Sequence, residues 1–182
     1  MEIKKVTVDV YDARLFYLLV KELKRLKIRL VPENGDIVIS DHNTGDIQIS
    51  SKEEIPRVIG KILCKVKGKD KFNELVIGID TNKNNLAIAV VGDGDLIDYY
   101  KVNEIKLKET IERILDTIPH ERVLINVGIG NSMGFEIYRR IKEEFKDNVY
   151  PIDEFNTSKN KITTRIKDED ILAAYNIALR TL

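Results

Sequence analysis

Residues 75–102 read LVIGIDTNKNNLAIAVVGDGDLIDYYKV, and they give the clearest indication of the fold. LVIGID (75–80) is an apolar run that ends in an acid, a pattern typical of a strand buried on both faces. LAIAVV (86–91) and LIDYYKV (96–102) flank the turn sequence GDGD (92–95), which is a strong hairpin signal. The three segments together predict an antiparallel meander of three strands.

Two helix and strand pairs, and then a last helix, are expected after the meander. Apolar residues at helical spacing predict helices over 104–118 and 134–146. Each helix is followed by an apolar segment, VLINVGIG (123–130) and VYPID (149–153), that predicts a strand. Asp168 is placed to cap a final amphipathic helix. The order βββαβαβα predicts an α/β fold with a mixed sheet and flanking helices.

The first 66 residues predict a separate, small α/β module without a visible catalytic constellation. Helices are expected after Asp12 and after Ser51. The expected strands are residues 6–10, 27–31, 36–40 and 46–50. The segment KGKDKFNE (67–74) is polar and lacks an apolar period, so it predicts a linker to the larger domain, 75–182.

Composition excludes several classes of protein. The chain has 182 residues, 43% of them apolar and 33% charged, which is typical of a folded domain and not of a disordered tail. Its single cysteine, Cys64, allows no internal disulfide and no multi-cysteine zinc site. No apolar run approaches the roughly 20 residues of a membrane span. The N-terminus lacks the apolar core of a signal peptide, so we expect a cytoplasmic protein.

Acidic residues stand at strand and helix ends that such a sheet brings together. Asp80 ends the first strand of the meander, Asp153 and Glu154 end the last strand, and Asp170 lies in the first turn of the final helix. Ligands of α/β sheets bind in the crevice beyond the strand ends. Converging carboxylates repel one another, and Mg²⁺ or Mn²⁺ with its preference for oxygen ligands relieves that repulsion. Two such ions can activate water against a phosphodiester.

Each of these acids also has a structural interpretation. Asp80 could begin a turn, and Asp170 could complement the dipole of the final helix. Asp153 and Glu154 are adjacent, so we expect only one of them to face the crevice. The sequence leaves these alternatives open.

Four segments of the larger domain resemble one family of nucleases. They are GIDTNK (78–83), VGIGN (127–131), DEFNTS (153–158) and DILAAY (170–175). In this order they resemble the ribonuclease H-like superfamily, and within it the RuvC and YqgF branch of Holliday junction resolvase-like nucleases. The resemblance covers residues 75–182. It implies a metal-dependent nuclease for DNA junctions or precursor RNA, with catalytic and metal-binding roles for Asp80, Asp153, Glu154 and Asp170.

The sequence also departs from that family pattern. Phe155 stands where the family has an arginine, and Gly130-Asn131 replaces a Leu-Pro step. RuvC proteins carry a glutamate at the end of the fourth strand, whereas residues 125–127 read Ile-Asn-Val. The alternative function is therefore a catalytically silent module that binds nucleic acid or protein. A sugar-kinase or actin-like ATP site is disfavoured, because the chain lacks a second glycine-rich phosphate loop.

Basic residues near the acids predict contact with a phosphate backbone. The loop 155–167 contains no acid, and Lys83 lies close to Asp80. The four basic residues of this loop are Lys159, Lys161, Arg165 and Lys167. The other interpretation is a solvated loop. The net charge of zero hides a separation, since residues 1–70 carry +3 and residues 71–182 carry −3. A resolvase needs two active sites to cut both strands, so the nuclease hypothesis also predicts a homodimer.

Overall fold

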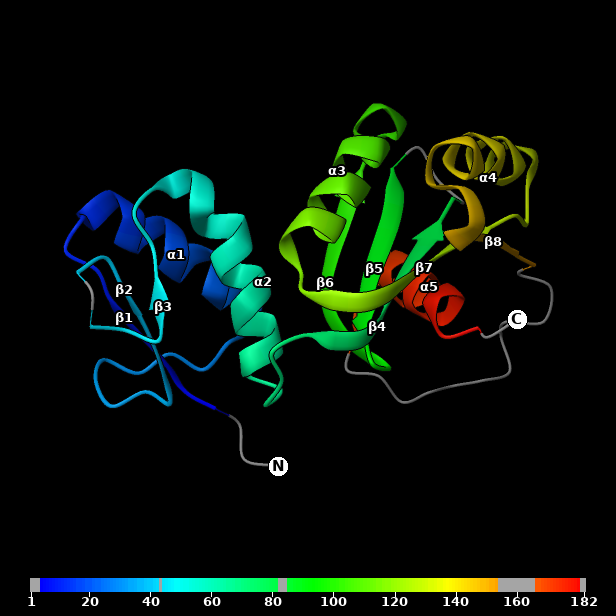
Figure 1. Ribbon diagram of the computed structural model, residues 1–182. Helices are drawn as coiled ribbons and strands as arrows, with labels where there is room; N and C mark the ends of the chain where they lie inside the picture. The colour runs from blue at the N-terminus through cyan, green and yellow to red at the C-terminus, as the bar shows by residue number, and fades with distance from the viewer. Residues whose placement is uncertain (1–3, 43, 82–84, 154–165, 181–182) are drawn as a thin grey trace. The chain divides into compact units, whose positions relative to one another are not determined.

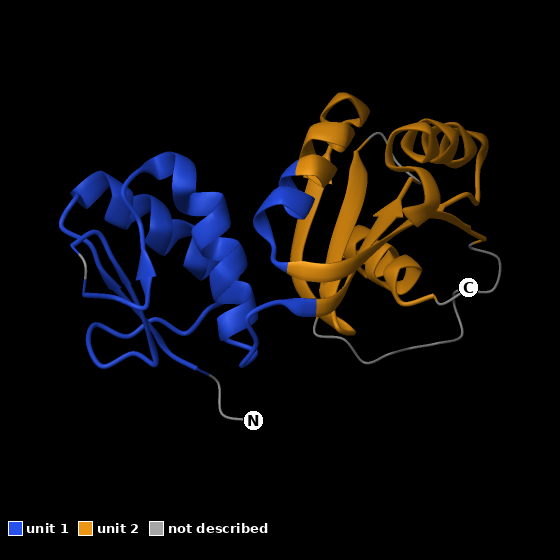
Figure 2. Cartoon of the chain, in the orientation of Figure 1, with its two compact units in different colours: residues 1–72, 113–119 blue, residues 73–112, 120–182 orange. Residues whose placement is uncertain are grey.

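The chain folds into two units. The computed structural model describes residues 4–42, 44–81, 85–153 and 166–180. The first unit comprises residues 1–72 and 113–119, and the second comprises residues 73–112 and 120–182 (Figure 2). The boundary at Phe72 falls inside the segment 67–74 that the sequence predicts as a linker. Phe72 is nevertheless buried, because it begins strand β4 (Phe72–Asp80).

The first unit is not continuous in the sequence, which differs from the predicted division at residues 66 and 75. Residues 113–119, at the end of helix α3 (Glu104–Thr117), group with it. The close approach of Gly60 to Thr117 gives one physical reason: a Cβ added at Gly60 would lie 1.9 Å from the Thr117 carbonyl oxygen. A single glycine in the sequence does not predict such a contact.

A small parallel sheet forms the centre of the first unit (Figure 1). Its strands are β1 (Val6–Asp9), β2 (Ile37–Ser40) and β3 (Ile47–Gln48), in that spatial order. Helix α1 (Ala13–Arg25) follows β1, with Asp12 as its N-cap. Helix α2 (Ile55–Lys65) follows β3 after a 3₁₀ turn at Lys52–Glu54. Each helix buries one apolar face, as its sequence period predicts.

The strand predicted at residues 27–31 is wrong as a member of the sheet. Within this segment only Leu30 forms a bridge, to Val6 of β1. The bridge consists of two backbone hydrogen bonds: the N–H of Val6 donates to the carbonyl of Arg29, and the N–H of Val31 donates to the carbonyl of Val6. Lys27 has a left-handed backbone with φ 56°, and Leu30 is only half-buried. The segment therefore has no fully buried face that would fix it as a strand.

The second unit contains a mixed five-stranded sheet in the order β6-β5-β4-β7-β8. Strands β4, β5 (Leu86–Gly92) and β6 (Asp95–Val102) form the predicted antiparallel meander. Strands β7 (His120–Gly128) and β8 (Val149–Ile152) pair in parallel. This arrangement confirms the prediction of an α/β fold with a mixed sheet. At the β5–β6 turn, Asp93 and Gly94 both have positive φ, as a tight hairpin requires.

Helices cover this sheet on its two faces (Figure 1). Helix α4 (Ser132–Phe145) packs on β7 and β8, and helix α5 (Glu169–Ala178) packs chiefly on β5. The contact with α5 is built from small residues, because a Cβ added at Gly78 of β4 would lie 2.2 Å from the Ala174 carbonyl oxygen. No helix within the described residues is long and apolar enough to cross a membrane.

Candidate functional site

The carboxyl ends of three strands meet at one edge of the five-stranded sheet. Asp80 is the last residue of β4 and is 5% exposed. The hydroxyl of Thr81 donates a 2.9 Å hydrogen bond to the carbonyl of Gly128, so the end of β4 lies beside the end of β7. Gly128 is in turn opposite Ile152, the last residue of β8. The segments that follow β4, β7 and β8 therefore all start from this edge.

The side chain of Asp80 lies on the face of the sheet that α5 covers. Side chains alternate along a strand, so Asp80 shares its face with Gly78, against which α5 packs. Asp80 is opposite Ala87 on β5, and Ala87 is opposite Lys101 on β6. Residues opposite each other across a ladder point to the same face. Asp80 and Lys101 therefore belong to one row, with only Ala87 between them.

Lys101 ties the first turn of α5 to this row. Its Nζ lies 2.8 Å from Asp168 Oδ2 and 2.9 Å from Asp170 Oδ2. These contacts raise the pKa of Lys101, chiefly through Asp168, and they lower the pKa of Asp168. The Asp168 carboxylate also accepts the backbone N–H groups of Asp170 and Ile171, so it is the predicted N-cap. Asp170 thus lies at the same edge and face as Asp80, where Lys101 balances its charge.

Of the other predicted site residues, the structure describes only Asp153 and Lys167. Asp153 directly follows β8 and is exposed, and its backbone carbonyl accepts a hydrogen bond from Arg180. Lys167 is exposed. Five predicted residues lie outside the described residues: Lys83, Glu154, Lys159, Lys161 and Arg165. Within the part of the chain that the structure describes, no three His, Cys, Asp or Glu side chains form a group that could hold a metal ion.

Asn126 is an important residue of this unit that the sequence did not single out. Its side chain is buried, and its Nδ2 lies 3.1 Å, 3.3 Å and 3.1 Å from the carbonyl oxygens of Ile177, Ala178 and Arg180. It therefore caps the C-terminal end of α5, where carbonyl groups lack helical partners. An amide donates these hydrogen bonds and a carboxylate cannot.

Lys101 was missed for a different reason. Strand β6 contains a bulge opposite Val90 and Val91, which shifts its register by one residue. A one-residue shift moves every later side chain to the other face of a sheet. Without the bulge, Lys101 would lie on the face away from α5. No signal in the sequence predicts it.

A second polar cluster lies at the strand ends of the first unit. His42, after β2, contacts Asp9 through Nε2 at 3.1 Å and Asp41 through Nδ1 at 3.0 Å. Its ring stacks on Tyr11 with a centroid distance of 4.1 Å. The hydrogen bond with His42, together with backbone N–H groups, lowers the pKa of Asp41 to about 2. The cluster fixes the loops after β1 and β2 to each other.

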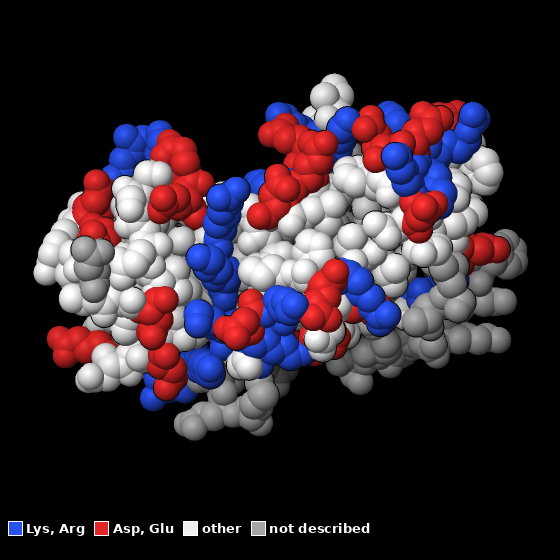
Figure 3. Space-filling model, viewed as in Figure 1, with Lys and Arg blue, Asp and Glu red and all other residues white. Residues whose placement is uncertain are grey.

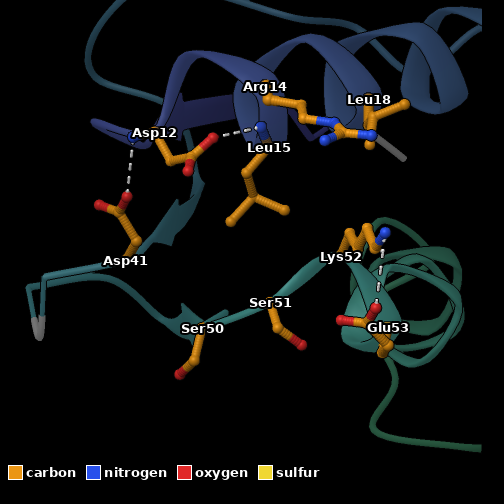
Figure 4. Close-up of a pocket in the computed structure, with 9 residues that line it drawn as sticks. All are labelled: Asp12, Arg14, Leu15, Leu18, Asp41, Ser50, Ser51, Lys52 and Glu53. Carbon is orange, nitrogen blue, oxygen red and sulfur yellow. Dashed lines mark hydrogen bonds and ion pairs between the residues drawn. The ribbon is translucent and has the colours of Figure 1, made fainter.

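A polar pocket lies beside this cluster, between the start of α1 and residues 50–53 (Figure 4). Asp12 and Asp41 line it from one side, and Asp41 accepts the backbone N–H of Asp12. Lys52 and Glu53 pair with each other at its other side. The charges in the pocket are therefore largely balanced locally, and we assign no chemistry to it.

Comparison of the chain with models of known protein families gives no match, and comparison with curated proteins gives none either. The assignment of the candidate site therefore depends on the geometry described above and on the sequence.

Proposed function

We propose that the second unit is a metal-dependent nuclease of the ribonuclease H-like fold, of the RuvC and YqgF type, which hydrolyses phosphodiesters in structured DNA or RNA. One observation supports this proposal most. A buried aspartate at the end of β4 and the acidic first turn of α5 share one edge and one face of the sheet. The element order from β4 to α5 is also the order on which the resemblance rests.

The residues at this edge suit a hard divalent cation in part. Asp80 and Asp170 would supply carboxylate oxygens on one face, and Asp153 and Glu154 follow β8, which lies two strands from β4 in the sheet. Mg²⁺ or Mn²⁺ held there would supply an activated water and stabilise the leaving oxygen. Lys101 balances the charge of Asp170 when no cation is bound. Lys167, with the basic residues of the preceding loop, would position the phosphate backbone.

A second candidate function is a silent module that binds nucleic acid or protein without cutting it. The ion pair between Lys101 and Asp170, at 2.9 Å, favours this alternative because it already neutralises one of the proposed metal ligands. The two functions differ in whether a cation displaces Lys101 from that carboxylate.

The direct test is cleavage of branched, duplex and single-stranded substrates in Mg²⁺ or Mn²⁺. We expect the wild type to cut at least one substrate and Asp80→Asn to lose at least a hundredfold in rate. Asp95→Asn is the matched control, since Asp95 begins β6 at the opposite end of the sheet. Circular dichroism and thermal melting would show that both variants fold.

Two results would contradict the nuclease proposal. Cutting that survives in Asp80→Asn would place the activity elsewhere or in a contaminant. Absence of cutting by a folded wild type on every substrate would favour the silent module.

A further inference from the structure

Helix α2 of the first unit carries only positive charges. Its charged residues are Arg57, Lys61 and Lys65, and its eleven residues include no acid. The spacing i, i+4, i+8 places the three on one side of the helix, over about 12 Å of its length. Arg57 and Lys61 are exposed and Lys65 is half-buried. A column of basic side chains is visible along α2 in Figure 3. We call these three residues the α2 stripe.

No ion pair neutralises the α2 stripe within the described residues. Asp46 and Asp70 line a shallow pocket with Lys61 and Lys65, but neither forms a salt bridge with them. Helices α3 and α4 differ, because three of their cations pair with acids. Their ion pairs are Lys106–Glu109, Lys108–Glu144 and Arg140–Glu104.

The packing of α2 on its unit depends on its apolar face. Residues Val58, Ile59 and Ile62 of α2 are buried and hold the helix in place. Like charges at i, i+4 repel each other and destabilise the helix that carries them. The following segment adds further charge, because residues 66–71 contain three lysines and one acid. A polyanion bound along this face would remove the repulsion.

We propose that the α2 stripe binds the phosphate backbone of a nucleic acid. A duplex presents about seven phosphates over the 12 Å that the stripe spans. An anionic membrane suits the helix less well, because membrane-surface helices expose apolar residues and those of α2 are largely buried. This inference deepens the proposed function, on which it rests for the identity of the ligand. It gives the first unit the role of a second contact with the polynucleotide.

The test measures binding of the full chain to labelled 30-base-pair duplex DNA and to single-stranded RNA, by fluorescence anisotropy in EDTA. The test variant replaces Arg57, Lys61 and Lys65 by glutamine. The matched control replaces Lys106, Lys108 and Arg140 by glutamine, which removes the same charge from α3 and α4. We expect at least a tenfold loss of affinity for the α2 variant and less than threefold for the control. The affinity of the α2 variant should also depend less on salt: the negative slope of log K against log salt should become shallower by about 2 to 3.

Three results would overturn the inference. They are equal losses in the two variants, absence of binding by the wild type, and wild-type binding to anionic phosphatidylserine vesicles without binding to nucleic acid. The outcome is separable from that of the cleavage test. Binding that depends on α2 without any cleavage contradicts only the nuclease, and cleavage with binding indifferent to α2 contradicts only this inference.

Discussion

Helices α2 and α5 carry opposite charges, and those charges lie in different surroundings. Helix α2 has three cations and no anion, whereas α5 has two anions and no cation. The acid Asp170 of α5 lies over a sheet edge, where Lys101 holds it. The cations of α2 lie at the surface without ion-pair partners among the described residues. In both helices the apolar face is buried, and the charged residues lie outside that face.

Both helices make a contact that only a glycine allows. The first is Gly60 of α2 against Thr117, and the second is Gly78 of β4 against Ala174 of α5. A backbone that approaches this closely leaves no room for a Cβ, so the two contacts fix where each helix lies.

The largest effect is expected from Asn126→Asp, at the end of α5. The new carboxylate would face three carbonyl oxygens in a buried position, with no donor to offer. We expect a loss of about 3 kcal/mol in the free energy of unfolding, measured by urea titration. Asn103→Asp is the matched control, because the Asn103 oxygen accepts the backbone N–H of Lys106 and an aspartate can do the same. Equal losses in the two variants would contradict the capping role of Asn126.

Gly78→Ala should cost about 2 to 3 kcal/mol, because the added methyl group would displace the backbone of α5. Gly68→Ala separates this effect from backbone strain. Gly68 has φ 73° and no atom within 4 Å of an added Cβ, so we expect its cost to be about 1 kcal/mol. Urea unfolding measures both variants. A loss at Gly78 no larger than that at Gly68 would show that α5 adjusts without cost.

Lys101→Met tests whether the lysine competes with a cation at the edge of the sheet. It leaves Asp168 and Asp170 without their cation, so Mn²⁺ affinity should rise about fivefold, measured by isothermal titration calorimetry. Lys106→Met removes an exposed lysine that pairs with Glu109 and should leave the affinity unchanged. Unchanged or weaker Mn²⁺ binding in Lys101→Met would count against a cation site that includes Asp170.

The same variant should change the response of the protein to acid. Lys101 lowers the pKa of Asp168 below its usual 3.8. A lowered pKa in the folded state contributes stability that is present above the unfolded value and is lost as pH falls through the folded one. Lys101→Met should therefore lose less stability than wild type between pH 4 and pH 2, measured by urea unfolding at each pH. Identical curves would show that the ion pair contributes nothing in solution.

The smallest effect is expected on α2. Lys61→Gln removes two like-charge contacts, with Arg57 and Lys65, so the protein should gain about 0.5 kcal/mol at low ionic strength. The gain should disappear in 0.5 M salt, because salt screens exposed charges. Lys106→Gln should show the opposite sign, since it removes the ion pair with Glu109. A loss of stability in Lys61→Gln would mean that this lysine has a structural partner.

Much of the second unit was predictable because its signals are local. The apolar runs of β4 and β5 and the turn at Asp93 and Gly94 predict the meander, and Asp168 predicts the start of α5. In the first unit, alternation predicts a strand at residues 27–31 that forms only one bridge, because alternation in a half-buried segment does not ensure pairing. The grouping of residues 113–119 with the first unit depends on a contact distant in sequence, so no local pattern predicts it.

The sequence alone indicates which acids stand at strand and helix ends and could carry chemistry, whereas the basic face of α2 is evident only once the burial of that helix is known. Hydrophobic period and turn chemistry fix the elements, and the elements fix which residues stand at their ends. Which charges lie close together depends on the tertiary structure. A bulge in β6 turns Lys101 toward Asp170, and the end of α5 turns Asn126 into a cap. Both contacts depend on strand register and on packing between segments far apart in the chain. The hydrophobic period of a single segment predicts neither the register nor the packing.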